Sequence, residues 1–433
     1  MNIIFLSIVL IAFVTAGGRQ FFIAPTSGHL SPMEALSKAM VDSAAASVEL
    51  AFGLVGVMTL FLGLMKVAEK GGLLTVIARL IRPLMARLFP EVPPEHPAMG
   101  AMILNMSANV LGLGNAATPF GIRAMQELNR LNPTPGSATD AMALFLAINT
   151  SSVTILPTGV IALRAAAGSV DPAGILPTTL FATACSTATA IIAVKLLRRF
   201  AREPLPCPAD TPPPADEGPA EPPEILPDTA QGAYPVWASV LALTGILTLI
   251  PVTVAYGRSI SPWILPGLMA GFLIFGLCRR VRVYEAFVDG AKDGFQVAVK
   301  IIPYLVAILV AVGMLRASGA MDLMVGALGP WTARVGLPAE ALPMALMRPL
   351  SGSGAFAILA SVINDPAIGP DSYTGYLVST LQGCTETTFY VLAVYFGAVQ
   401  VRRIRYTLAA GLIADLAGVA ASVAACTYLL TTS

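Results

Sequence analysis

The sequence predicts an all-α polytopic membrane protein with two inverted-topology repeats that contain broken or re-entrant helices. Three observations lead to this prediction: an apolar composition, a proline-rich segment that divides the chain, and polar interruptions inside apolar stretches. Of the 433 residues, 56% are hydrophobic and only 12% are charged. Soluble domains carry about 25% charged residues, so we expect this chain to lie in a lipid bilayer.

Composition also excludes several classes of function. The net charge of +1 gives no overall field that would attract nucleic acid. The five cysteines form no CxxC pair, and His29 and His96 lie far apart, so we expect neither a disulfide framework nor a metal site. No phosphate-binding loop of the type G-x-x-x-x-G-K-[ST] occurs. We therefore expect no cofactor, no metal and no direct use of ATP.

Several apolar runs are long enough to cross a bilayer. The clearest are residues 234–256, 259–278, 301–315, 374–401 and 407–433, and shorter candidates are 3–18 and 50–65. The N-terminal run has the length of a signal peptide, but no basic n-region precedes it and further membrane segments follow. We interpret it as the first helix of a multi-pass protein in the bacterial cytoplasmic (inner) membrane.

A proline-rich, acidic segment divides the chain. Residues 203–228 contain ten prolines and seven acidic residues without lysine or arginine, which is typical of an extended linker. The predicted organisation is a first membrane repeat at 1–200, a cytoplasmic linker at 201–232, an extra connecting transmembrane helix at 233–258 and a second membrane repeat at 259–433.

The two halves resemble each other distantly. In the first, 21 positions separate Asp42 from Gly63, and in the second, 20 positions separate Asp293 from Gly313. Each aspartate lies in an amphipathic segment, 32–49 or 284–300, that leads into an apolar run containing the glycine. We expect these two segments to lie along the membrane surface as scaffold helices.

Basic residues indicate that the repeats are inverted. They gather at residues 66–87, 195–202, 279–282 and 402–405, and the positive-inside rule places all four groups in the cytoplasm. Residues 49–66 would then run inward while 300–317 run outward. A single extra crossing at 234–256 explains the inversion, and inverted repeats with interrupted helices are a recurring transporter design.

Each half contains two polar interruptions at membrane depth, at 105–119 and 149–158 in the first half and at 348–354 and 382–388 in the second. Backbone groups there must bind protein or line a wet cavity, because lipid offers no hydrogen bonds. The alternative is that these polar residues only pack helices together. The predicted substrate-binding residues are Asn105, Asn109, Gly112, Gly114, Asn115, Thr118, Asn149, Ser151, Ser152, Thr154, Arg348, Ser351, Ser353, Gln382, Thr385, Glu386 and Thr387.

Glu386 is the predicted coupling residue. A carboxylate in the middle of a membrane helix costs about 2.5 to 3.5 kcal/mol on insertion scales, so it needs a partner, a proton or an ion. Arg348 is the candidate counter-charge. If the two residues pair, we expect the pair to be structural; if Glu386 binds a proton or a cation, we expect it to couple transport. For Asp415, in the last apolar run, we favour a structural role.

The stretch NMSANVLGLGNAATPFGIRAM resembles spore maturation protein A, and this resemblance extends over about residues 1–199. RPLSGSGAF and STLQGCTETTFYVLAVYFGAV are similar to spore maturation protein B, from about residue 260 onward. The resemblance implies a fused form of the two proteins. It also implies membership of the nucleoside recognition (gate) domain group, which shares a region with concentrative nucleoside transporters and ferrous iron transporter B. It implies no agreed substrate.

Three functions follow as hypotheses. The first is a transporter or channel for a small polar solute, nucleoside-like, zwitterionic or ionic, bound between the repeats. The alternative is a non-transporting membrane scaffold for envelope or spore-maturation assembly. An enzyme is least favoured, because beside hydroxyls the polar clusters offer only Glu386 and Cys384. The expected partners are the solute and the bilayer, and a homo-oligomer is compatible with the exposed apolar helices.

Overall fold

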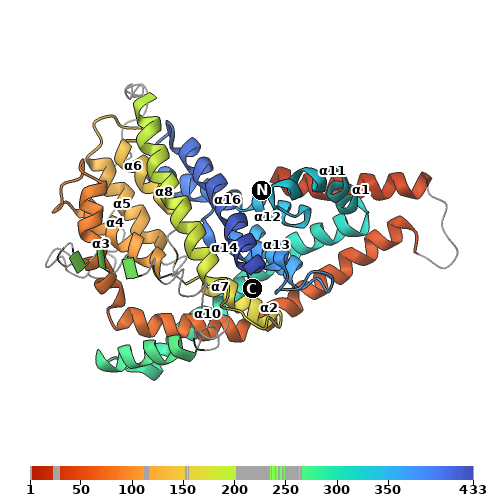
Figure 1. The fold of residues 1–433 in the computed structure, drawn as a ribbon, viewed down its shortest axis with the longest axis horizontal. Helices are drawn as coiled ribbons and strands as arrows, with labels where there is room; N and C mark the ends of the chain where they lie inside the picture. Colours follow the sequence, from red (N-terminus) through yellow and green to blue (C-terminus); the bar gives the residue numbers. More distant parts are fainter. Residues whose placement is uncertain are drawn as a thin grey trace.

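The structure is a computed structural model that describes residues 2–22, 30–111, 117–151, 154, 156–200 and 266–432, with isolated positions at 235, 237–238, 240–241, 244–245, 248 and 263. The predicted linker and most of the predicted connecting helix at 233–258 therefore lie outside the described residues. Within these ranges the chain is an assembly of α-helices (Figure 1). The all-α prediction is confirmed.

The helices of the first half are α1 (Asn2–Phe22), α2 (Pro32–Lys70), α3 (Leu73–Leu88), α4 (Pro97–Val110), α5 (Ala117–Arg130), α6 (Asp140–Ser151), α7 (Thr158–Ala166) and α8 (Leu176–Phe200). The second half has α10 (Val283–Ala317), α11 (Ala320–Thr332), α12 (Leu342–Met347), α13 (Gly352–Ile363), α14 (Tyr373–Cys384), α15 (Thr388–Ala398) and α16 (Thr407–Thr432), and the helix Pro266–Cys278 precedes them. Short 3-10 turns at Ala333–Val335 and Ala339–Ala341 join α11 to α12.

The series α2 to α8 and the series α10 to α16 follow the same order of long, short and broken helices. A left-handed glycine begins the third helix of the first half and its counterpart in the second: Gly72 with φ +81° before α3, and Gly319 with φ +77° before α11. Glycine adopts this conformation without the steric cost that other residues have. The shared turn supports a structural repeat.

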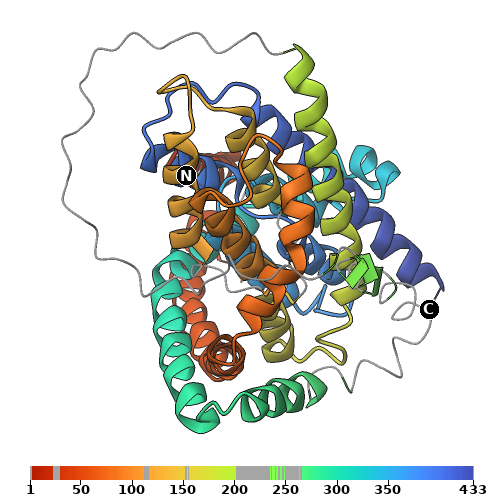
Figure 2. The ribbon, with the colours of Figure 1, turned by 90° about the vertical axis from the view of Figure 1, so that its left-hand side faces the viewer.

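Equivalent helices of the two halves run antiparallel. Lys70 at the end of α2 pairs with Asp289 near the start of α10 at 2.8 Å, whereas Gly313 near the end of α10 approaches Ser43 near the start of α2. Likewise, Ser186 of α8 donates a 2.9 Å hydrogen bond to the carbonyl of Ala414 on α16, and these helices cross the molecule side by side (Figures 1 and 2). The halves are therefore inverted with respect to each other.

The amphipathic segments at 32–49 and 284–300 do not form separate surface helices. Each is continuous with the apolar run that follows it, in α2 and in α10, and these two long helices pack against each other (Figure 2). Small residues allow the close approach: a Cβ added at Gly294 would lie 2.7 Å from Cα of Thr59 and 2.8 Å from the carbonyl oxygen of Met58.

Gly294→Ala should therefore destabilise the protein. The new methyl group meets backbone that cannot rotate away, and overpacking of this kind costs about 1–3 kcal/mol. The measurement is the thermal unfolding midpoint in detergent, with Gly326→Ala as control, because no atom lies within 4 Å of a Cβ added at Gly326. Equal midpoints for the two variants would show that α2 and α10 are not in close contact.

Two hydrophobic cores each contain helices from both halves. Val160 and Leu163 of α7 pack in a core with Met344 and Leu359, from the second half. Phe396 of α15 packs instead with Met102 and Phe145, from the first half. The helix pairs α6–α7 and α14–α15 thus cross from one core to the other, and their breaks lie at the crossing.

The apolar run 374–401 is accordingly not a single crossing helix, as its length had indicated, but α14 and α15 with a break between them.

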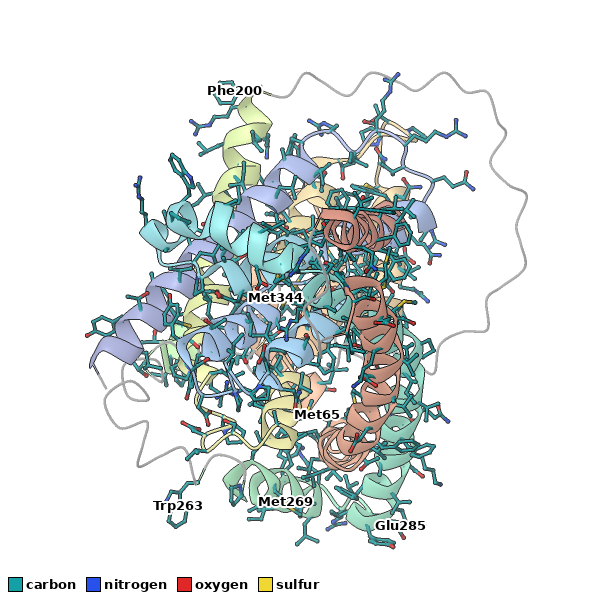
Figure 3. The ribbon with its side chains drawn as sticks, turned by 90° about the vertical axis from the view of Figure 1, so that its right-hand side faces the viewer. Met65, Phe200, Trp263, Met269, Glu285 and Met344 are labelled. Atoms are coloured by element: carbon teal, nitrogen blue, oxygen red, sulfur yellow. The ribbon has the colours of Figure 1, made fainter. Side chains whose placement is uncertain are left out.

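Two of the described helices, Leu176–Phe200 and Thr407–Leu429, are long and apolar enough to cross a bilayer. Shorter apolar helices are Phe5–Phe21, Pro266–Cys278 and Gly352–Ile363. Large apolar side chains such as Val14, Ile192 and Leu416 are exposed, as expected for a surface that faces lipid. Figure 3 shows the contrast between Met344 in the interior and Trp263 at the periphery.

An ion pair joins the two halves at each end of α8 and α16. Arg164, in α7, contacts Asp371, before α14, at 3.0 Å. The equivalent elements supply Arg405, after α15, which contacts Asp140 at the start of α6 at 2.7 Å. A tyrosine ring lies beneath each guanidinium, Tyr376 at 4.3 Å and Tyr406 at 5.1 Å. The 25 residues of α8 separate these two contacts by about 37 Å at the helical rise.

Candidate functional site

A cavity of about 190 Å³ lies where the helix breaks of the two halves meet. It is lined by Asn109, Thr154, Leu156, Pro157, Thr158, Gly159, Val160, Arg348, Gly352, Phe356, Gln382, Gly383, Thr385 and Glu386. All four predicted interruptions thus contribute to one cavity. Amide, hydroxyl and charged groups converge there with a few apolar side chains, as in small-molecule sites.

Hydrogen bonds between the breaks hold the cavity walls together. Asn109, in the last turn of α4, donates to Oδ1 of Asn149 on α6 at 2.9 Å. The backbone amide of Glu386 donates to the carbonyl of Thr150 at 2.7 Å. These bonds satisfy backbone and amide groups that the broken helices would otherwise leave unpaired in lipid.

Arg348 connects the α12–α13 break to the α14–α15 break. Its guanidinium donates to the carbonyl of Thr385 and to Oγ1 of Thr387, the latter at 3.1 Å. The carboxylate of Glu386 lies 3.8 Å away, so the predicted pairing is present but is a loose contact. The Arg348 side chain is 7% exposed and that of Glu386 is 44% exposed. The cation is therefore fixed by the protein, whereas the carboxylate remains open to the cavity.

Helix ends bring partial charges of both signs to the cavity. The first residues of α7 (Thr158) and of α13 (Gly352) line it, so two positive helix N-termini face the space. The last turns of α4 (Asn109) and of α14 (Gln382) also line it and bring the negative, carbonyl-bearing ends. Helix termini carry about half a unit charge of each sign. Oε1 of Gln382 is buried without a protein partner among the described residues, so it is available to accept a hydrogen bond.

The structure sorts the predicted site residues into groups. Asn109, Thr154, Arg348, Gln382, Thr385 and Glu386 line the cavity. Asn149 and Thr387 do not line it but bind residues that do. The described residues Asn105, Thr118, Ser151, Ser351 and Ser353 are not among its lining residues. Gly112, Gly114, Asn115 and Ser152 lie outside the described residues.

Some polar residues away from the cavity join helices, as the packing alternative expects. Asn105 is buried and donates to the carbonyl of Ala117 and to the hydroxyl of Tyr395, which links α4 to α5 and α15. Ser151 bonds to the carbonyl of Ile148 and to Oγ1 of Thr187. Ser351 caps α13 through the amide of Gly354.

Sequence reasoning missed part of the wall. Pro157 and Thr158 belong to the predicted interruption at 149–158, and Gly159 follows it directly. Phe356 lies one turn beyond Gly352 on α13 and covers part of the cavity. No sequence signal marks it, because an isolated phenylalanine in an apolar helix is indistinguishable from a core residue.

A larger cavity of about 400 Å³ lies at the end of the molecule that carries the Arg405 ion pair. Its charged residues already pair with one another: Arg198 contacts Glu91 at 3.2 Å and Asp140 at 3.0 Å. The cavity at the helix breaks is the stronger candidate, because it has polar groups that the protein leaves open.

The profile of the Gate family, described as nucleoside recognition, matches residues 51–167 and 298–402, one stretch in each half. Together these stretches make up just over half of the chain. The chain belongs to the Gate family. Both matched stretches include the helix breaks that form the cavity, so the family region and the candidate site coincide.

This Gate protein is 46% identical to spore maturation protein B of Bacillus subtilis (strain 168) over 165 residues, which make up 38% of this chain and 92% of the relative. It is 42% identical to spore maturation protein A of the same strain over 192 residues, 44% of this chain and 92% of the relative. Each relative matches only part of the chain, as a fusion of the two requires. Inner membrane protein YjiG of Escherichia coli (strain K12) is 32% identical over 103 residues, 24% of this chain and 64% of the relative.

Among solved structures, CNTnw in an outward-facing state is 12% identical and covers all of both chains with a TM-score of 0.45. The Alcanivorax borkumensis YdaH transporter is 17% identical, with 99% of this chain and 98% of that chain covered and a TM-score of 0.37. The scores indicate that the helices of this Gate protein superpose only loosely on theirs. Its site is therefore described from its own contacts.

Proposed function

We propose that this protein is a transporter or channel of the bacterial inner membrane that binds a small zwitterionic solute, such as an amino acid, between its inverted repeats. The observation that carries the proposal is the cavity at the helix breaks, to which both halves contribute and which a cationic and an anionic side chain both line. Relatives that are membrane proteins support the cellular location.

The charges of the walls match a zwitterion. A solute carboxylate would lie against Arg348 and the N-termini of α7 and α13, where anions bind favourably. A solute ammonium would lie against Glu386 and Oε1 of Gln382. Its contact with Glu386 would replace the loose 3.8 Å ion pair within the protein.

The size of the cavity favours a small solute. Sites for drug-sized ligands measure about 300 to 1,000 Å³, whereas this cavity measures about 190 Å³. A nucleoside would need further opening of the walls, and an amino acid would not. This comparison supports a zwitterion over a nucleoside.

The test is a thermal-shift screen of the purified protein against amino acids, nucleosides and inorganic ions. A ligand at a hundredfold excess over its Kd stabilises the native state by about 2.7 kcal/mol. We expect a shift with amino acids that is lost in Glu386→Gln and kept in the control Glu285→Gln, whose carboxylate lies at the periphery (Figure 3). A shift with nucleosides alone would overturn the zwitterionic assignment.

The non-transporting scaffold is the second candidate, and the spore maturation names of two relatives favour it. It predicts no ligand-induced shift at all. It also predicts that substitutions in the linker and basic loops abolish function while substitutions in the cavity are tolerated.

A further inference from the structure

Asp415 is a buried carboxylate in the middle of α16 that is not part of the proposed binding site. It is 5% exposed, and its Oδ2 accepts a 2.6 Å hydrogen bond from Oγ1 of Thr388. Oδ1 is also buried but has no hydrogen-bond partner among the described residues. A carboxylate buried in this way without a counter-charge is strongly destabilising as an anion.

No cation of the described chain neutralises it. The guanidinium of Arg348 binds Thr385 and Thr387 and contacts Glu386 instead. The neighbouring titratable group on α14 is the thiol of Cys384.

The other helices packed around Asp415 present hydroxyls that are already used. From α8, Ser186 donates to the carbonyl of Ala414, and from α6, Thr150 donates to the carbonyl of Ala147. Among the described residues no group of three or more His, Cys, Asp and Glu side chains is placed to hold a metal ion. A proton on Oδ1 would neutralise the carboxylate.

We propose that Asp415 is a proton-binding site that is coupled to the cavity. A proton from water binds Oδ1, while Oδ2 keeps its contact with Thr388. Thr388 begins α15, and Thr387 just before it accepts a hydrogen bond from Arg348, which lines the cavity. Charge on Asp415 thus acts on the position of Arg348 through two adjacent threonines. The coupling to a solute rests on the proposed function, whereas proton binding itself does not.

This assignment differs from the coupling role predicted for Glu386, which stays a prediction. Glu386 is partly exposed and has the guanidinium of Arg348 beside it. Asp415 is buried, and among the described residues it forms no ion pair, so its protonation changes the charge of the protein interior.

Infrared spectroscopy of the full chain in lipid nanodiscs, followed across a pH titration, tests the proton site. We expect a carbonyl band of a protonated carboxylic acid that disappears as the pH rises. The band should be absent in Asp415→Asn and present in the control Asp322→Asn, whose carboxylate is exposed. A band that persists unchanged in Asp415→Asn would overturn the assignment, and so would a wild-type protein without a titrating band.

Thr388→Val provides a second variant in case Asp415→Asn does not fold. Because it removes the hydroxyl that stabilises the carboxylate, the band should persist to a higher pH. An unchanged titration would contradict the contact between the two residues.

Coupling has a separate readout: the apparent Kd of the amino acid that gives the largest thermal shift should depend on pH in the wild type and lose that dependence in Asp415→Asn. If the wild type binds the amino acid with an affinity that does not depend on pH, the coupling is overturned and the proposed function stands. Failure of every amino acid to bind would overturn the proposed function and, with it, the coupling to a solute, but would leave the infrared result on the proton site intact.

Discussion

Arg164→Met is expected to lower the free energy of unfolding by about 3 kcal/mol, the range observed when one partner of a buried ion pair is removed. Arg164 is 0% exposed and donates to the carbonyl of Pro370 at 2.6 Å, to the carbonyl of Asp171 at 3.2 Å and to Asp371 at 3.0 Å. Methionine fills much of the space but leaves both carbonyls without this donor. Because Arg164 and Asp371 belong to different halves, the loss removes a contact that joins the two repeats at one end.

Thermal or denaturant unfolding of the detergent-solubilised protein measures this effect. Arg130→Met is the matched control, since Arg130 is 74% exposed and its pairing with Glu127 at 3.0 Å lies within one helix. Exposed pairs contribute less than about 1 kcal/mol. Equal losses in the two variants would contradict a role of the Arg164 contact in joining the halves.

Arg348→Met is expected to weaken binding of the solute at least about 100-fold. Hydrogen bonds to a charged group contribute about 1.5–3 kcal/mol each, and every 1.4 kcal/mol is a factor of ten in affinity. The substitution removes both the charge that faces the solute carboxylate and the guanidinium that holds Thr385 and Thr387 in place. Arg348→Lys keeps the positive charge but lacks the planar guanidinium with its several N–H donors, so it should recover only part of the affinity.

Calorimetric titration with the amino acid found by thermal shift measures this loss. Arg334→Met serves as the control, because Arg334 is exposed and stacks on Trp331 away from the cavity. Retained affinity in Arg348→Met would show that the solute does not bind beside Arg348.

Sequence patterns located the helix breaks well because the physical signal is local. Glycine, proline and hydroxyl residues inside an apolar run have few explanations other than an interruption, and all four interruptions meet at the cavity. Opposite charges in apolar surroundings likewise had to approach each other, as Arg348 and Glu386 do. The inversion was predictable from the distribution of basic residues.

Other features depend on which helices pack together, and a single sequence does not record this. Asn105 and Asn109 are one turn apart on α4, yet the first joins helices and the second lines the cavity. Nothing local shows that α7 and α15 pack in the core of the opposite half. Arg164 is an ordinary arginine near a helix end, and only the approach of the loop that contains Asp371 makes it a buried contact.

Uptake into proteoliposomes tests the central claim most directly. An isotope-labelled mixture of amino acids would be offered to vesicles that contain the wild-type protein, Glu386→Gln or the control Glu285→Gln. We predict uptake by the wild type and by Glu285→Gln, and a loss of uptake in Glu386→Gln. Wild-type vesicles that take up no more label than protein-free vesicles would contradict transport of a zwitterion through the cavity between the repeats.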